Sequence, residues 1–374
     1  MITVGTLFDG YLNINILLIV ATLIWAGVRL VMRLLSHSEN YALKLRLFKA
    51  LILTCFALPI MVELFDRLVR QGGRDAAYSL SLSDLVVTQY LHGSLDVKAA
   101  ELDQILGLRG RFTEEFLALN SQFAFIVAGL LLLGLLIGLA RLLVSLYRLH
   151  TILDNCFTWR RFGNVHLLLS ERVTTPFSTR GLFNRYIVIP VAMLEHGKDL
   201  HIALSHEFQH LRQRDTEWEV GLEFLHPLFF WNPAFYVVKR NIERLRELGC
   251  DQLVVARKAI SVQDYCACLL RTCESGLKRR EHMLRARPSV AFVQVDGSGA
   301  GVGSMPFLKL RMLSLIRGRK TGNHGLIFVA FVVPTVALVC LAGVMMQKPN
   351  DWSHDRIMFS TIINLDRLAA RNHQ

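Results

Sequence analysis

Three residues near the middle of the chain, His206, Glu207 and His210, form an H-E-x-x-H pattern. Four residues make just over one turn of an α-helix, so both imidazoles would lie on one helix face and could bind a single Zn²⁺ ion. The ion would lower the pKa of a bound water toward about 7, and Glu207 could take the proton of that water. The alternative interpretation is a surface helix that carries two unrelated histidines.

A catalytic zinc site needs a third protein ligand, and Glu247 is the candidate, 37 residues after His210. Asp251 lies four residues further on and would share the helix face of Glu247, where it could accept the free N–H of a ligand histidine. The alternative for Glu247 is a solvated ion pair with a neighbouring arginine. Asp215 could be a further acceptor behind the ligands or an exposed charge near a helix end.

Two helices must bring these residues together. Apolar residues recur at three- and four-residue spacing from Leu200 to Leu211, which predicts a helix that begins near Asp199. A second helix is predicted from about Ala234 to Arg257. The turn at His226–Pro233 would fold the two into an antiparallel hairpin and place Glu247 over the histidine pair.

Short strands precede these helices. Val165–Leu169 and Tyr186–Ile189 are rich in β-branched and apolar residues and are predicted as strands. The segment between them, Thr174–Asn184, contains Pro176 and Gly181 and is predicted as a loop. The fold class is therefore α+β: a mostly helical, zincin-like metallopeptidase domain with a small β-sheet.

Four stretches are apolar enough to cross a bilayer, which takes about 20 residues. They are Tyr11–Val28, Ala50–Val62, Phe123–Ala140 and Gly325–Met346. The second is short and spans only if the apolar residues on either side join it; its alternative is a buried core helix. With 52% hydrophobic and 19% charged residues, the composition excludes disordered, collagen-like and small disulfide-stapled proteins.

The net charge of +12 is distributed unevenly between the predicted spans. The stretches 29–49 and 141–324 are net positive, whereas 63–121 is net negative. Because positive loops stay cytoplasmic, both termini and the stretch 63–121 are predicted to be extracytoplasmic and the peptidase domain cytoplasmic, in an inner membrane. The positive charge is thus expected to face the lipid bilayer, with no direct binding of nucleic acid. The basic cluster Arg311, Arg317, Arg319 and Lys320 would either attract anionic lipid or form an ordinary solvated flank of span four.

The predicted organisation follows from these spans. It comprises residues 1–66 (spans one and two with a cytoplasmic loop), 67–121 (an extracytoplasmic loop), 122–144 (span three), 145–324 (the peptidase domain), 325–346 (span four) and 347–374 (a short extracytoplasmic tail).

Several strings in this layout resemble the BlaR/MecR family of integral-membrane zinc metallopeptidases. They are His-Glu-Phe-Gln-His-Leu-Arg-Gln-Arg-Asp from 206, Phe-Trp-Asn-Pro from 230, Arg-Glu-Leu-Gly-Cys-Asp from 246 and Thr-Pro-Phe from 175. The resemblance implies a gluzincin-like domain in which His206, His210 and Glu247 bind Zn²⁺, Glu207 is the general base and Asp251 supports a ligand. It also implies the relay of an outside signal by cleavage of the protein itself or of a cytoplasmic repressor.

The chain departs from that family at its C-terminus. The antibiotic sensors carry a large penicillin-binding domain after span four, whereas about 28 residues follow here from Gln347, without a Ser-x-x-Lys motif. Direct acylation by a β-lactam is therefore not expected. Sensing would use the stretch 63–121, the tail, the lipid or a partner.

Other candidates carry weaker signals. His226, Tyr236 and Arg180 could polarise the scissile carbonyl or stabilise the oxyanion, although such residues are more often packed or exposed. The glycines between 297 and 303 suggest a surface loop where self-cleavage could occur. The cysteines at 266, 268 and 273 lack the spacing of a metal cluster and are predicted as apolar residues of a buried helix, with reduced thiols.

The sequence thus predicts a zinc metalloendopeptidase that transduces a signal across a membrane. Its substrate would be itself or a cytoplasmic protein, for which a transcriptional repressor is one candidate. One alternative is a housekeeping quality-control protease like HtpX, which shares H-E-x-x-H and a distal glutamate. Another is a receptor scaffold with a structural metal, against which the intact Glu207 argues.

Overall fold

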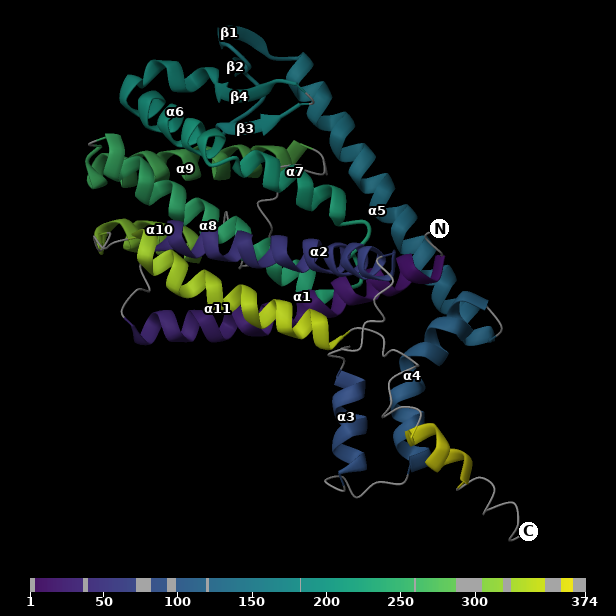
Figure 1. Ribbon diagram of the computed structural model, residues 1–374. Coiled ribbons are helices and arrows are strands. Elements are labelled where there is room, and N and C mark those ends of the chain that lie inside the picture. Colours follow the sequence, from purple (N-terminus) through teal and green to yellow (C-terminus); the bar gives the residue numbers. More distant parts are fainter. Residues whose placement is uncertain are drawn as a thin grey trace. The chain divides into compact units, whose positions relative to one another are not determined.

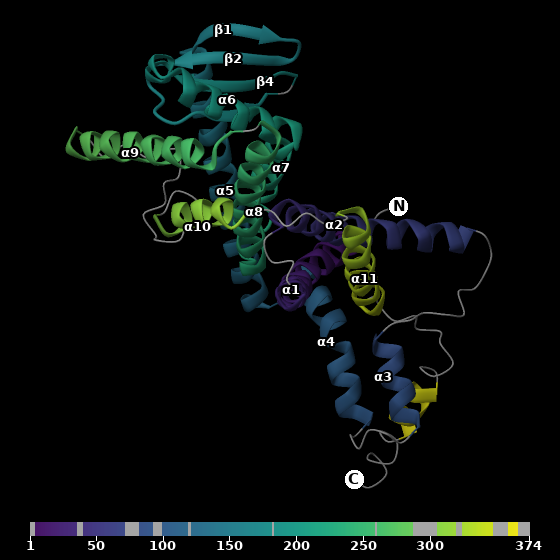
Figure 2. The ribbon, with the colours of Figure 1, turned by 90° about the vertical axis from the view of Figure 1, so that its left-hand side faces the viewer.

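The computed structural model is mostly helical, with one small mixed sheet (Figures 1 and 2). It describes residues 4–35, 40–71, 82–92, 99–118, 121–181, 183–258, 260–286, 305–318, 324–346 and 358–365. The chain divides into two compact units. Unit one comprises 1–28, 50–132 and 329–374, and unit two comprises 29–49 and 133–328. The predicted α+β class is confirmed, whereas the glycine-rich stretch 297–303 lies outside the described residues.

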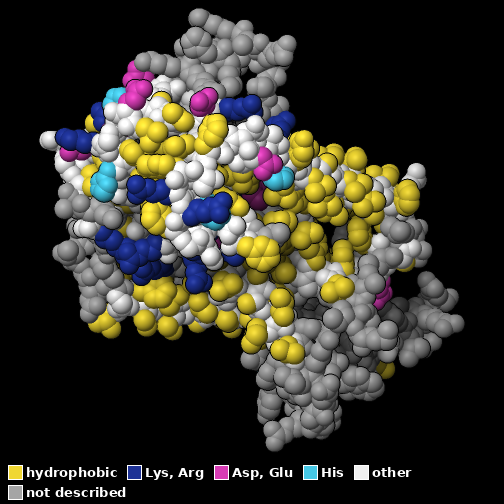
Figure 3. Space-filling model, turned by 90° about the horizontal axis from the view of Figure 1, so that it is seen from above, with side chains coloured by type: hydrophobic (Ala, Val, Ile, Leu, Met, Phe, Trp, Pro, Cys, Tyr) yellow, Lys and Arg dark blue, Asp and Glu magenta, His cyan; other side chains and the backbone are white. Residues whose placement is uncertain are grey.

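Four helices are long and apolar enough to cross a membrane: Leu7–Leu34 in α1, Tyr41–Val62 in α2, Gln122–Asp154 in α5 and Gly325–Met345 in α11. The four predicted spans are therefore confirmed as helices of sufficient length. The second is longer than its apolar run because the helix continues back to Tyr41. Many of their large apolar side chains are exposed, as lipid-facing helices require, and Figure 3 shows hydrophobic side chains gathered on parts of the surface. The protein is an integral membrane protein.

Unit one is built from helices. It contains most of α1 (Val4–Leu34), α2 (Tyr41–Gln71) and α11 (His324–Met345), the first part of α5 (Gln122–Asp154), α3 (Leu82–Leu91) and α4 (Ala99–Ala118). Gly343 lets α11 approach α2 closely, because a Cβ there would lie 2.1 Å from a methyl group of Leu58. Helices α3 and α4 fall in the stretch predicted as an extracytoplasmic loop. They share a small core with the helix 358–365, made by Val87, Leu102, Phe359 and Ile363.

Unit two contains a four-stranded sheet in the order β1-β2-β4-β3. The strands are β1 (Phe157–Phe162), β2 (Val165–Ser170), β3 (Phe177–Arg180) and β4 (Arg185–Pro190); β2 and β4 are parallel and both outer strands are antiparallel to their neighbours. The two predicted strands are confirmed as β2 and β4. The prediction of a loop over Thr174–Asn184 is wrong for Phe177–Arg180, which is too short to show an alternating pattern. Strand β1 is exposed along its whole length and gives no such pattern either.

One side of the sheet packs on α6 (Gly197–Arg212), the helix that carries the histidine pair. Leu167, Ile187 and Ile189 of the sheet form a buried cluster with Leu211 of α6. This contact uses the apolar face that the spacing from Leu200 to Leu211 predicted, and it leaves the opposite face of α6 for other helices (Figure 2).

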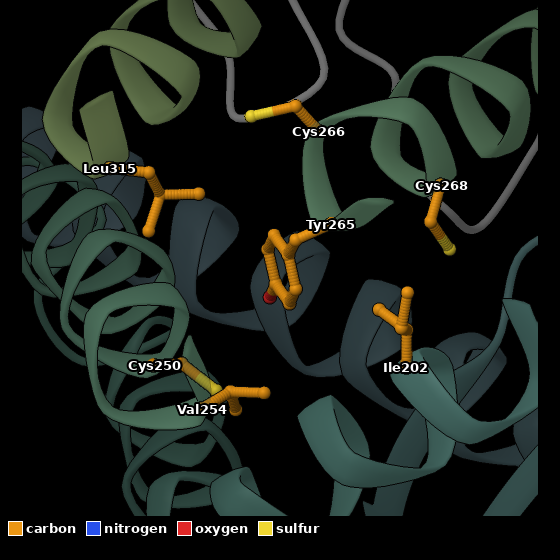
Figure 4. Close-up of a cluster of buried hydrophobic side chains, with 7 residues drawn as sticks. All are labelled: Ile202, Cys250, Val254, Tyr265, Cys266, Cys268 and Leu315. Carbon is orange, nitrogen blue, oxygen red and sulfur yellow. The ribbon is translucent and has the colours of Figure 1, made fainter. Parts of the chain in front are cut away.

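After α6, unit two continues with the helices α7 (Asp215–Leu225), α8 (Pro233–Lys258), α9 (Val262–Ala286) and α10 (Met305–Ile316). Helix α6 contacts α7, α8 and α9, and α10 contacts α8 and α9. A second buried cluster joins Ile202 of α6 with residues of α8, α9 and α10, and Tyr265 stands in its middle (Figure 4). Cys266 and Cys268 belong to this cluster as free thiols, so their prediction as apolar core residues is confirmed.

Candidate metal centre

The two histidines of α6 lie one turn apart and face the same point. Their Nε2 atoms are 3.1 Å apart, and the rings are nearly perpendicular. Both side chains are largely buried, because α8 and α9 cover this face of the helix. The predicted pairing of His206 and His210 on one helix face is thus present.

The Nδ1 atom of each histidine forms a hydrogen bond on the side of the ring away from the other histidine. Nδ1 of His210 lies 3.0 Å from Oδ2 of Asp215, and a carboxylate can only accept, so this nitrogen carries the proton. Nδ1 of His206 lies 2.8 Å from the hydroxyl of Tyr265, which itself donates to Oδ1 of Asp251 over 2.7 Å. The hydroxyl donates its only proton to Asp251 and therefore accepts a hydrogen bond from the Nδ1–H group of His206. In the neutral form of each ring, the lone pair therefore lies on Nε2.

A sharp break in the chain places Asp215 behind His210. Helix α6 ends at Arg212 and α7 begins at Asp215, and between them Arg214 has a left-handed backbone, with φ 55° and ψ 36°. A helix end near Asp215 was expected, but the left-handed turn was not, because this conformation is unfavourable for a residue with a side chain. The turn it produces brings Asp215 back to the helix end.

Glu247 of α8 faces the two free nitrogens. Its carboxylate oxygens lie 3.5 Å from Nε2 of His206 and 3.6 Å from Nε2 of His210. Ligand atoms about 2.0–2.1 Å from a tetrahedral ion are about 3.3 Å apart. The spacing of the three donors therefore fits one zinc-sized ion.

Cys250 offers another donor, which the sequence had not suggested. His206, His210 and Cys250 each present a ligand atom within 4.8 Å of the others and could hold a metal ion. The Sγ atom lies 3.5 Å from Nδ1 of His206 and 3.4 Å from its carbonyl oxygen. Cys250 approaches His206 at Nδ1, where the hydroxyl of Tyr265 also lies, whereas the oxygens of Glu247 approach both Nε2 atoms.

The charges around the pair favour a cation. Burial lowers the pKa of His206, but the Cys250 thiolate and a hydrogen bond with Glu247 outweigh it and raise the pKa to about 10. Burial raises the pKa of Glu247, yet the charges of His210 and Arg311 hold it well below its usual value. A negative carboxylate thus faces two nitrogens in a site that attracts positive charge, as a metal-ligand set requires.

Glu207 follows His206 on α6 and is also buried. Among the described residues, none forms a hydrogen bond or ion pair with its carboxylate. Within this part of the chain the carboxylate therefore has no structural partner, which suits a general base.

The three weaker candidates make other contacts. Arg180 pairs with Glu217, the hydroxyl of Tyr236 donates to the carbonyl of Phe230, and the ring of His226 packs on Tyr236. Within the described part of the chain, no hydrogen bond or ion pair joins these three side chains to the histidine pair.

Both aspartates lie behind the histidines. Asp215, predicted as an outer acceptor or an exposed charge, contacts His210 directly, and Asp251 reaches His206 through Tyr265. The interpretation of Arg311 as a lipid-facing or solvated residue is wrong. Its side chain is 12% exposed, and its guanidinium forms two hydrogen bonds of 2.7 Å with Asp251. Two other members of that basic cluster, at 319 and 320, lie outside the described residues.

Sequence reasoning also missed Tyr265 and Lys49. The amino group of Lys49, on α2, lies 2.7 Å from Oδ1 of Asp215. Both residues come from helices remote in sequence, and no spacing pattern ties them to the H-E-x-x-H string.

A protein-family model described as BlaR1 peptidase M56 matches residues 10–291, about three quarters of the chain. No curated protein matches it.

Proposed function

The chain belongs to the BlaR1 peptidase M56 family, and on this premise we propose that it is a membrane-embedded zinc metallopeptidase that relays an extracytoplasmic signal by cleaving itself or a cytoplasmic regulator. Membership confirms the resemblance to the BlaR/MecR proteins and implies a metallopeptidase that acts on proteins. The single observation that supports the zinc assignment is the arrangement of the two free Nε2 atoms and the Glu247 carboxylate.

In this proposal His206, His210 and Glu247 hold the ion. When bound, zinc polarises the scissile carbonyl and lowers the pKa of water. Glu207 takes the proton of the attacking water and passes it to the leaving amine. Asp215 and the Tyr265–Asp251 pair keep both histidines in the tautomer that presents Nε2 to the ion.

The proposed orientation places the peptidase domain in the cytoplasm. The support is the net positive charge of stretches 29–49 and 141–324 and the net negative charge of 63–121. With this orientation a stimulus outside the membrane would act on a cytoplasmic substrate, which is the reason for proposing a relay.

The test separates metal binding from catalysis. Glu207→Gln removes the base and keeps the three ligands, so the full-length variant should bind Zn²⁺ like the wild type and cleave nothing. Glu223→Gln, at a 43% exposed carboxylate on α7, is the matched control and should behave like the wild type. The measurement is mass spectrometry of new N-termini, in the purified protein and in the cytoplasmic proteome of cells with each variant.

Two results contradict the proposal. If Glu207→Gln produces the same new N-termini as the wild type, the residue is not the catalytic base. If the wild type cleaves a broad set of misfolded membrane proteins, instead of itself or one or two regulators, the protein is a quality-control protease.

A further inference from the structure

Two cations stand behind the histidine pair, each joined to one histidine through an aspartate. Lys49 contacts Asp215, which contacts His210; Arg311 contacts Asp251, which reaches His206 through Tyr265. All of these residues belong to unit two.

The first chain of contacts begins on α2. Nζ of Lys49 donates to Oδ1 of Asp215 over 2.7 Å, while Oδ2 accepts from His210. The side chains of Lys49 and Asp215 are 13% and 1% exposed, so water cannot readily replace the lysine. Burial raises the pKa of Asp215, but the hydrogen bond from His210 and the charge of Lys49 outweigh it and hold the pKa below its usual value.

The second chain of contacts begins on α10. Nε and Nη2 of Arg311 bind both oxygens of Asp251, which is fully buried, and Nη1 lies 3.3 Å from Glu247. One oxygen of Asp251 also accepts the proton of Tyr265. A bidentate guanidinium fixes the plane of a carboxylate, so Arg311 determines where the hydroxyl of Tyr265 points.

We propose that Lys49 and Arg311 are positioning residues that set the metal affinity of the centre from two membrane-associated segments. The inference rests on the proposed function, because it takes His206 and His210 as metal ligands. Lys49 lies inside the candidate span Tyr41–Val62, and α10 ends shortly before the candidate span Gly325–Met345. A displacement of α2 or α10 moves one aspartate, and with it the histidine that this aspartate orients.

The experiment measures Zn²⁺ affinity of the full-length protein in detergent by competition with a chromophoric chelator. Lys49→Met and Arg311→Met should each weaken binding 10- to 100-fold, the usual effect of removing groups that orient metal ligands. Lys239→Met and Arg271→Met are matched controls, because each removes a cation from a carboxylate pair in the same unit that does not touch the histidines. Both controls should bind Zn²⁺ like the wild type.

Two further variants cover the case in which a methionine variant does not fold. Lys49→Arg keeps the charge on Asp215 and should lose less affinity than Lys49→Met. Tyr265→Phe keeps the ring in the core but removes the hydroxyl, and it should weaken binding because His206 loses its acceptor. If Lys49→Met, Arg311→Met and Tyr265→Phe bind Zn²⁺ like the wild type, the cations serve stability alone and the proposal is wrong.

These outcomes are separate from those of the peptidase test. A wild type that binds Zn²⁺ with the expected dependence on Lys49 and Arg311 but cleaves nothing supports the positioning role and contradicts the peptidase proposal. If the wild type cleaves but the three substitutions leave Zn²⁺ affinity unchanged, the peptidase proposal is supported and the positioning role is contradicted.

Discussion

Among the described residues of unit two, two arginine–aspartate pairs have nearly the same geometry but different surroundings. Arg311 binds Asp251 over 2.7 and 2.7 Å, and Arg271 binds Asp199 over 2.7 and 2.5 Å. The side chains of the first pair are 12% and 0% exposed, whereas those of the second are 52% and 10% exposed. Equal distances therefore do not imply equal consequences, because water can replace a lost partner only in the second pair.

The pairs also differ in what lies behind the carboxylate. Asp251 accepts from Tyr265 and so connects to His206, while Asp199 lies in the first turn of α6, next to the free backbone N–H groups of the helix start. The buried pair therefore orients a residue of the candidate metal site, whereas the exposed pair stabilises the beginning of a helix. Four substitutions test this comparison, beginning with the largest expected effect.

Arg311→Met should destabilise the protein most. It leaves the carboxylate of Asp251 buried without its cation, and breaking a buried pair in this way costs about 3–5 kcal/mol. The free energy of unfolding, measured with the metal removed, reports this loss. A loss of about 1 kcal/mol or less would mean that the pair behaves like a surface pair.

Lys49→Met should have the next largest effect, about 1.5–3 kcal/mol, because Asp215 loses one charged hydrogen bond but keeps the one from His210. The same unfolding measurement applies, with Lys239→Met as control. Equal losses in the two variants would show that burial of the Lys49–Asp215 pair has no energetic effect.

Tyr265→Phe should lower the free energy of unfolding by about 1–2 kcal/mol, since it removes a neutral hydroxyl while the ring still fills the core shown in Figure 4. Nδ1 of His206 then lies 3.4 Å from Asp251, which becomes the nearest acceptor. A stability equal to that of the wild type would mean that His206 gains this direct contact without loss.

Arg271→Met should have the smallest effect, about 0–1 kcal/mol, and it should depend on pH. Hydrogen bonds from Arg271 hold the pKa of Asp199 below its usual value, against a small opposing effect of burial. The contribution is therefore complete above the unfolded-state pKa of about 3.9 and is lost as the pH falls through the lower folded-state pKa. The difference in Tm between wild type and variant should be constant from neutral pH down to about pH 4 and shrink as the pH falls further; a difference that grows on acidification would contradict the assignment.

The parts of the site that local spacing defines were predictable from the sequence. His206 and His210 share a face because of helical periodicity, and Glu247 lies on a helix whose bounds were nearly predicted. The apolar spans were predictable for the same reason, since the length and composition of one segment suffice.

The supporting residues were not predictable, because they depend on how distant helices pack. Tyr265, Lys49 and Arg311 reach the site from α9, α2 and α10, and no local pattern links them to α6. Arg311 was misassigned because a basic residue shortly before a span ordinarily faces lipid headgroups. The left-handed turn at Arg214 was not predictable because its backbone conformation opposes local preference.

The identity of the third metal donor tests the account most directly. X-ray absorption spectroscopy of the zinc-loaded, full-length protein measures which atoms surround the ion. With His206, His210 and Glu247 as ligands, the spectrum should contain only nitrogen and oxygen neighbours at about 2.0–2.2 Å. A sulfur neighbour at about 2.3 Å that disappears in Cys250→Ser would assign the site to Cys250 and contradict the proposed ligand set.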